Sequence, residues 1–334
     1  MRPSPVAVLT ALLSSCSGAI ALGTTNNRPS CNRKSLSDAH RNKRDVRPED
    51  ILFGKGRWNL KRRNIIESIT FVAGAVLPFP TAAYVDPKTG VLLPEEGEVE
   101  KAVPSIWDNE NPFETMGRNE FSRLDSAPDS IFYTDPRFVE HVDENSVKGL
   151  TSYISNTLLQ PGDSVLDLCS SWTSHIDANT QAKLGLKRVS GLGMNEKELS
   201  ANSALTDWTV LDLNKNNPRL PYDDSSFDTV LCQLSIDYLT RPLEVMTEVG
   251  RVLKPGGKVA ILFSNRLFLQ KAVGLWTGAD DLDHVYIVAS YLHYSGGNFD
   301  QISAEDLSTR SGRGKTRRIV GDPLYAVTAV KKST

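Results

Sequence analysis

The sequence contains little cysteine or histidine and no long apolar run. Four Cys and five His among 334 residues are too few for a disulfide framework. No Cys-x-x-Cys or His-Glu-x-x-His spacing points to a metal site. No uninterrupted apolar stretch reaches the roughly 20 residues that cross a bilayer. These absences exclude a disulfide-rich scaffold and a polytopic membrane protein, and we expect no metal and no transmembrane span in the mature protein.

The charge is unevenly distributed along the chain. The net charge is −2, but residues 1–63 carry 13 Lys and Arg against 4 Asp and Glu, which leaves 25 against 36 for the rest. The body of the protein is therefore acidic. Because nucleic-acid binders present a basic face to the phosphates, we expect no nucleic-acid partner. Cys169 and Cys232 lie in or beside apolar runs and are predicted to be buried, reduced thiols.

The first 63 residues have the composition of targeting sequence. Residues 1–21 combine Arg2, an apolar run and small residues ending at Ala21, which is typical of a cleaved signal peptide. Residues 22–63 are rich in Arg, Lys, Ser, Thr and Asn, and the first acidic residue of the chain is Asp38. The two segments together resemble the bipartite presequence of plastids that lie inside extra membranes. They predict a plastid (chloroplast) protein.

A third targeting element is predicted at residues 64–83. The basic residues at 61–63 precede an apolar run over 65–79, and small residues follow at 81–83. This pattern resembles a twin-arginine signal for the thylakoid lumen. The alternative is a membrane-surface helix or a hairpin packed on the domain, since prolines and Glu67 interrupt the run. The lumen therefore remains one of two expected compartments, beside the stroma.

Residues 84–129 predict an extended arm, and residues 130–334 predict one α/β domain. The arm is rich in Pro, Glu, Asn and Asp and shows little periodicity. An amphipathic helix pair is expected between 136 and 160, and short apolar runs then alternate with helical stretches, which builds a parallel sheet covered on both faces. The expected strands are 164–168, 188–192, 209–213, 227–234, 258–263, 298–303 and 324–330, and the expected helices are 176–184, 195–205, 241–253, 266–276 and 281–294.

The last two strands should form a hairpin through the basic loop 310–318, so the final strand should run antiparallel. In a doubly wound sheet the ligand binds outside the carboxyl ends of the strands. The residues that follow each strand are therefore the candidate site.

Two motifs identify the fold family. The run 224–230 reads Asp-Ser-Ser-Phe-Asp-Thr-Val before the fourth strand, and 251–257 reads Arg-Val-Leu-Lys-Pro-Gly-Gly before the fifth. In this order and spacing they resemble class I S-adenosylmethionine-dependent methyltransferases of the type 11, ubiquinone-biosynthesis-like group, over residues 130–332. The resemblance implies a Rossmann-like, mostly parallel seven-stranded sheet with an antiparallel last strand, and S-adenosyl-L-methionine as cofactor.

The resemblance also implies cofactor-binding residues. An acid that ends the first strand orients the methionine amino group in the family, and Asp167 stands there. A carboxylate after the third strand accepts from the adenine amino group, with the next apolar residue stacking on the ring, and Asp212 and Leu213 match. The alternative for both acids is a helix cap or a turn former.

Two positions depart from the family pattern. Cys169, Ser170 and Ser171 replace the glycines of the first loop, and Gly193 stands where the family places the ribose-binding acid. Asn195 or Glu196 could substitute for that acid, with the Ser170 and Ser171 hydroxyls and the backbone of Gly191 to Gly193 helping. These variants together look like a plastid and cyanobacterial-type subgroup, so we expect an altered pocket rather than a decayed one.

Substrate residues are weakly encoded. Tyr133 precedes the domain where family members place a lid aromatic, His175 follows the first loop, and Tyr286 lies between the fifth and sixth strands, where acceptor pockets are built. Each could equally be a packing residue. No residue can be named as catalytic, because methyl transfer needs little beyond alignment of the reactants.

Two functions remain after the sequence has been read. The first is a methyltransferase acting on a small or lipophilic acceptor in the plastid. The second is a catalytically inactive protein of the same fold that serves as a binding or assembly factor of a plastid complex. A nicotinamide enzyme is disfavoured because no Gly-x-Gly-x-x-Gly opens the first helix. The acceptor and the oligomeric state are not encoded in any pattern found.

Overall fold

The structure is a computed structural model that describes residues 84–333 apart from 118, 216 and 315–316. The expected signal peptide (1–21), transit-like segment (22–63) and twin-arginine signal (64–83) lie outside the described residues.

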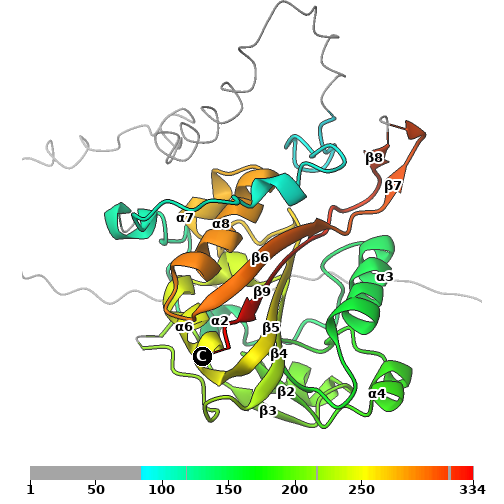
Figure 1. Cartoon of the computed structure of the whole chain (residues 1–334), viewed down its shortest axis with the longest axis vertical. Coiled ribbons are helices and arrows are strands. Elements are labelled where there is room, and N and C mark those ends of the chain that lie inside the picture. The colour runs from blue at the N-terminus through cyan, green and yellow to red at the C-terminus, as the bar shows by residue number, and fades with distance from the viewer. Residues whose placement is uncertain (1–83, 118, 216, 315–316, 334) are drawn as a thin grey trace, which may run out of the picture. The chain divides into compact units, whose positions relative to one another are not determined.

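A seven-stranded sheet forms the centre of the described domain, in the order β3-β2-β1-β4-β5-β9-β6 (Figure 1). Neighbours from β3 to β5 pair in parallel, and β9 pairs antiparallel with both β5 and β6. This is the Rossmann-like methyltransferase fold, and the predicted antiparallel last strand is confirmed. The strands are β1 (Ser164–Ser170), β2 (Arg188–Gly193), β3 (Asp207–Val210), β4 (Phe227–Gln233), β5 (Leu253–Phe263), β6 (Phe299–Asp306) and β9 (Tyr325–Lys331).

Helices cover both faces of the sheet because β1 alternates its apolar side chains. Leu166 and Leu168 pack in the core under α6 (Pro242–Val252) and α8 (Asp281–Tyr294). Val165 packs in the core under α3 (Glu144–Tyr153), the π-helical turn Ile154–Leu158 and α4 (Ala178–Leu184). The remaining helices are α2 (Asp129–Phe132), α5 (Glu196–Ala201) and α7 (Gly274–Thr277).

Three local predictions were wrong. The expected helix pair over 136–160 is a loop followed by α3 and its π-helical turn. Most of the expected helix 266–276 is a loop, because the buried Lys271 ammonium pairs with Asp125 at 2.9 Å and holds the chain in an irregular path. The third strand ends at Val210 and not at Leu213, because the Asp212 carboxylate accepts from the Asn214 amide and turns the chain.

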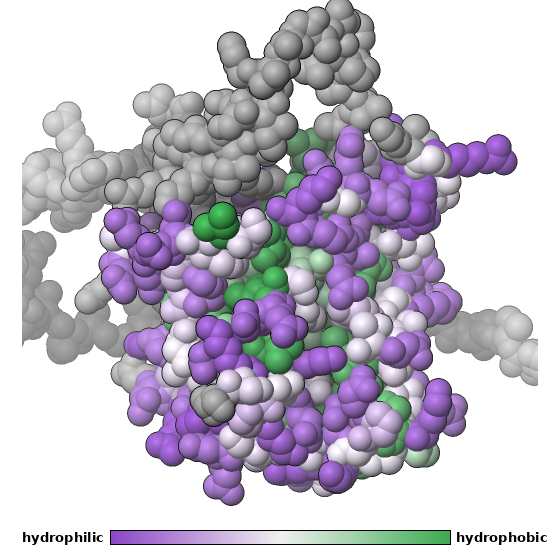
Figure 2. Space-filling view, viewed as in Figure 1, coloured by the Kyte–Doolittle hydropathy of each residue, from purple (hydrophilic) through white to green (hydrophobic). Residues whose placement is uncertain are grey.

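The arm 84–129 packs against the domain through a few anchoring contacts. Arg266 pairs with the arm residue Asp86 at 3.0 Å, and the ring of Trp107 stacks on His293 of α8 at 4.3 Å. The short strands β7 (Arg310–Ser311) and β8 (Arg318–Ile319) extend the β6–β9 hairpin into the predicted basic tip. Hydrophilic side chains dominate the face shown in Figure 2, and hydrophobic ones gather toward its middle.

Candidate functional site

A cavity lies at the carboxyl ends of β1 to β4, where the doubly wound fold predicts a ligand. The segment 129–141, which includes α2, lines it from the opposite side, and we call this segment the roof. The cavity contains most of the predicted site residues, namely Tyr133, Asp167, Ser170, Ser171, His175, Gly193, Asp212 and Leu213.

Asp167 organises the first loop. Its side chain is 1% exposed, and both of its carboxylate oxygens are engaged. The hydroxyls of Ser170 and Ser174 each donate to Oδ2 at 2.6 Å, and the Gln233 amide donates to Oδ1 at 3.0 Å. Burial raises the pKa of Asp167, and these three hydrogen bonds oppose that effect. The predicted cofactor acid is therefore also a structural hub that connects β1, the loop and β4.

The first loop keeps a glycine-like backbone without glycine. Cys169 has a φ of 58°, a left-handed conformation that residues other than glycine adopt at a cost. His175 (φ 51°) and Leu234 (φ 49°) share this conformation, and all three residues line the cavity. Each such residue stores on the order of 1–3 kcal/mol of strain. Cys169 therefore adopts a turn that glycine would adopt without strain.

The end of β2 has no room for an acidic side chain. A Cβ added at Gly193 would lie 2.1 Å from the backbone oxygen of Ser170, far inside contact distance. Ser170 follows the irregularity in the pairing of β1 with β2, which brings its carbonyl group against Gly193. The backbone of the first loop therefore excludes any side chain at position 193.

Three predicted residues lie elsewhere. Asn195 caps α5, since its Oδ1 accepts from the amides of Lys197 and Glu198 while its Nδ2 donates to the backbone oxygen of Tyr133 at 2.8 Å. The Asn195 side chain therefore makes its hydrogen bonds with the helix cap and the roof, and it does not line the cavity. Gly191 lies inside the sheet against Leu205.

Tyr286 lies on α8 beside Trp107 of the arm, with ring centroids 6.1 Å apart. The structure therefore places this predicted substrate residue away from the cavity at the strand ends, because the arm covers that part of α8.

Glu198 is the carboxylate that stands on the wall after β2. It is 7% exposed and lies on α5, where Oε2 accepts from the Ser171 hydroxyl and Oε1 accepts from the Arg137 amide, both at 2.7 Å. Sequence reasoning considered Asn195 and Glu196 and missed Glu198. Its position one helical turn after the end of β2 is the signal that could have indicated it.

A hydrogen-bonded chain connects Asp167 to the roof. Gln233 donates to Asp167 and to the backbone oxygen of Ser174, so its amide oxygen faces His175 Nδ1 at 2.8 Å. His175 Nε2 lies 3.1 Å from the Glu140 carboxylate. Both ring nitrogens face acceptors, an arrangement that favours the doubly protonated ring. Burial works against the charge, but the Glu140 carboxylate raises the pKa of His175 above its ordinary value of 6.5.

The third strand leads into the predicted adenine position. The Asp212 side chain lines the cavity and accepts from the Asn214 amide at 2.9 Å, and Leu213 is buried beside it. Asn214 in turn donates to Asp129 of the roof at 2.7 Å and accepts from the Thr240 amide. The adenine side of the cavity is therefore fixed to the roof as well.

The roof and its neighbours are aromatic. Phe132 and Phe268 approach with ring centroids 5.4 Å apart, and His141 lies 5.3 Å from Phe268. Burial and the nearby Arg137 lower the pKa of His141. The next residues after β4 add a buried carboxyl group, Asp237, whose pKa burial raises to about 8. The roof side of the cavity therefore combines aromatic rings with the charged side chains of Asp129, Arg137 and Glu140.

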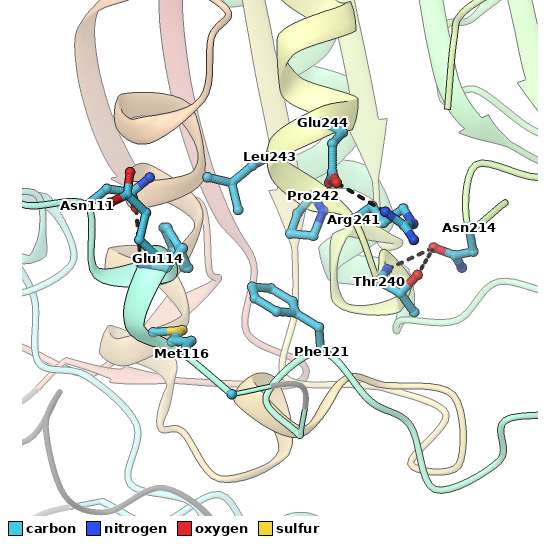
Figure 3. A pocket seen from close by; sticks show the side chains of 12 residues that line it. Asn111, Glu114, Met116, Phe121, Asn214, Thr240, Arg241, Pro242, Leu243 and Glu244 are labelled. Carbon is cyan, nitrogen blue, oxygen red and sulfur yellow. Dashed lines mark hydrogen bonds and ion pairs between the residues drawn. The ribbon is translucent and has the colours of Figure 1, made fainter. Parts of the chain in front are cut away.

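A wider, open groove of about 830 Å³ lies on the other side of Asn214 (Figure 3). The arm contributes Phe121, which points toward Pro242 at the start of α6. Arg241 pairs with Glu244 at 3.2 Å. Since the groove holds none of the predicted site residues, the cavity at the strand ends is the candidate site.

The close approach at Gly193 can be tested by adding one methyl group. We expect Gly193→Ala to lower the free energy of unfolding by about 1–3 kcal/mol, because the backbone of Ser170 has to move. Gly149→Ala in α3 is the matched control, since its Cβ would meet Leu307 O at an ordinary 3.4 Å. This control should be neutral or stabilise by up to about 1 kcal/mol. Urea unfolding measures both, and equal effects would contradict the steric argument.

The charge on His175 predicts a pH dependence. A folded pKa above the unfolded one gives stability that is fully present below the unfolded pKa and is lost as pH rises through the folded pKa. The free energy of unfolding should therefore fall as pH rises above 6.5 and through the raised pKa of His175, and His175→Gln should reduce that fall. Urea unfolding of the parent and of His175→Gln at a series of pH values on both sides of 6.5 checks it. Parallel pH profiles for the parent and His175→Gln would refute the assignment.

Comparison with known proteins shows what part of this chain is similar to. Residues 173–261 match the family model described as a methyltransferase domain. A demethylmenaquinone methyltransferase of Bacillus cereus (strain B4264) is 32% identical over 111 residues, which cover 31% of this chain and 46% of that protein. A malonyl-[acyl-carrier protein] O-methyltransferase of Marinomonas sp. (strain MWYL1) is 33% identical over 97 residues, covering 28% and 34%. The chain thus spans less than half the length of these curated relatives.

Comparison with solved structures gives a further alignment. An S-adenosylmethionine-dependent methyltransferase from Mesorhizobium loti aligns with a TM-score of 0.39 at 16% identity, over 55% of this chain and all of that chain. Among the residues that the structure describes, no helix is long and apolar enough to span a bilayer, and no cluster of three His, Cys, Asp or Glu side chains could hold a metal ion. By these matches, residues 173–261 are similar to the methyltransferase domain family, within a chain that has the Rossmann-like fold of class I methyltransferases.

Proposed function

We propose that this protein is an S-adenosylmethionine-dependent methyltransferase that acts on a small or lipophilic acceptor. One observation carries the proposal: the segment that matches a methyltransferase domain supplies the ends of β2, β3 and β4 to the cavity, beside the end of β1. The names of the relatives, which act on demethylmenaquinone and on a malonyl-carrier protein, support a small or lipophilic acceptor.

The donor set of the cavity fits the cofactor. S-adenosylmethionine carries an electrophilic methyl group on a sulfonium, and its positive charges suit a wall that contains carboxylates. Asp212 would accept from the adenine amino group, with Leu213 against the ring. Glu198 offers the carboxylate nearest to the end of β2, where Gly193 leaves no room for one. Asp167 would act through the loop that it holds and not through a free oxygen.

The aromatic roof would face the acceptor. Tyr133, Tyr238 and Phe268 line the cavity. Apolar rings stabilise a planar or lipophilic molecule by burying its surface. The roof would also exclude water from the methyl group, which would otherwise compete with the acceptor.

A specific observation favours the second function, a catalytically inactive factor of a plastid complex. The roof is fastened to the cavity floor by the Arg137–Glu198 and Glu140–His175 contacts, and Asp167 is saturated by the chain's own donors. In a protein that only binds a partner, contacts that fasten the roof over the cavity would stabilise the fold. Cofactor binding therefore separates the two functions.

Calorimetric titration of the full chain with S-adenosylmethionine and S-adenosylhomocysteine tests the proposal. Both should bind, and Asp212→Ala should weaken binding about 10- to 150-fold, because one charge-assisted hydrogen bond is lost. Asp223→Ala removes an exposed carboxylate outside the cavity and should leave affinity unchanged. Absence of binding at millimolar cofactor would reject the enzyme and leave the inactive factor in its place.

We also propose that the protein works in the plastid, in the stroma or the thylakoid lumen, and that roughly its first 83 residues are targeting sequence. The support is the sequence composition alone, namely the successive signal, transit-like and twin-arginine patterns. Terminal sequencing of protein from isolated plastids tests this. An N-terminus near Tyr84 would agree with location in the lumen, and one near Leu22 or Asn64 would reject the lumen. An intact Met1 would reject the proposed plastid targeting altogether.

A further inference from the structure

Arg137 is a cation in the cavity that has no carboxylate partner among the described residues. It lines the cavity, is half-buried, and donates one side-chain hydrogen bond, from Nη2 to the backbone oxygen of Phe132 at 3.0 Å. We infer that Arg137 binds a carboxylate group of a ligand inside the cavity. The inference rests on the proposed function in one respect, because the amino-acid end of the cofactor is one of two sources of that carboxylate.

The neighbouring cations are already neutralised. His175 pairs with Glu140, and the Lys271 ammonium lies 2.9 Å from Asp125. Arg123 donates to both oxygens of Asp129 at 2.7 and 2.8 Å. Charged side chains taken out of water need a partner. Among these cations Arg137 breaks the pattern, and it lines the cavity, where a ligand can supply the missing charge.

The guanidinium group of Arg137 is held in position before any ligand arrives. It stacks over the Phe132 ring at 4.3 Å and lies 5.6 Å from the centre of the Phe268 ring. The backbone amide of Arg137 is fixed by Glu198 at 2.7 Å. A guanidinium that stacks through its faces keeps its N–H donors in the plane of the group, where they form a fork for a carboxylate. Because the guanidinium group is already ordered in the free protein, less conformational entropy is lost when a ligand binds.

Two ligands could supply the carboxylate: the methionine end of the cofactor, or an acceptor held by the aromatic roof. The cofactor source is tested by comparing S-adenosylhomocysteine with 5′-methylthioadenosine, which has the same nucleoside but no carboxylate. The acceptor source is tested by comparing 2-naphthoate with the neutral 2-naphthamide on protein saturated with S-adenosylhomocysteine. 2-Naphthamide replaces only the carboxylate of 2-naphthoate, whereas 5′-methylthioadenosine lacks the whole amino-acid end of S-adenosylhomocysteine, its amino group included.

The experiment is calorimetric titration of the full chain, of Arg137→Gln and of Arg137→Lys. In one of the two pairs, Arg137→Gln should lower the affinity for the ligand that carries the carboxylate by about 10- to 150-fold. This is the loss expected for a charged hydrogen-bonded pair. Its neutral counterpart should bind unchanged. Arg137→Lys keeps the charge but loses the fork, so it should fall between the two. Lys148→Gln, which removes an exposed cation on α3, is the matched control and should change nothing.

The outcomes distinguish the cofactor from the acceptor as the source of the carboxylate, and they distinguish the inference on Arg137 from the proposed function. A loss confined to S-adenosylhomocysteine assigns Arg137 to the cofactor, and a loss confined to 2-naphthoate assigns it to the acceptor. No loss in either pair, or an equal loss for the neutral ligands, overturns the inference. If neither nucleoside binds the parent protein, the proposed function fails and the naphthoate pair, run without nucleoside, decides on Arg137 alone. If Arg137→Gln does not fold, unchanged affinities in Arg137→Lys overturn the inference.

Discussion

The buried carboxylate of Asp167 is the constraint on which the cavity depends. Three donors from the first loop and from β4 converge on it, and through Gln233 and His175 it reaches Glu140 in the roof. Removing one donor would leave a buried charge partly unsatisfied, at a cost that exceeds the value of a single hydrogen bond. The sheet edge, the loop and the roof are therefore coupled through one side chain.

The two departures from the glycine-rich pattern have a common physical cause. Cys169 keeps the left-handed turn, and the chain then brings the Ser170 carbonyl group against Gly193, where no side chain fits. An acid at the end of β2 would require a different loop. Glu198, on α5 beyond the end of β2, supplies a carboxylate to the cavity wall and accepts a hydrogen bond from Ser171 of the first loop.

The sequence predicts the sheet well because strand alternation and the two turn motifs are local signals. It predicts the site less well because the wall combines segments that are far apart in the chain. Asn195 has the right residue type for a ligand but serves as a helix cap, and Tyr286 is covered by Trp107. Arg137 and Glu198 meet across about 60 residues of sequence. No periodicity encodes such a contact, since it depends on the arm and roof packing on the finished domain.

Backbone strain supports the view that the cavity is a functional site and not a remnant. Seven non-glycine residues in the described chain have positive φ. Asn217, Ser225, Asn298 and Gln301 are exposed, where such conformations disturb little. The other three, Cys169, His175 and Leu234, all line the cavity, and two of them are residue types that rarely adopt this conformation. Strain persists only where the surroundings over-determine it. In the first loop, the hydrogen bonds of Asp167 hold the strained backbone in place. The strain lowers the stability of the fold and maintains the shape of this cavity.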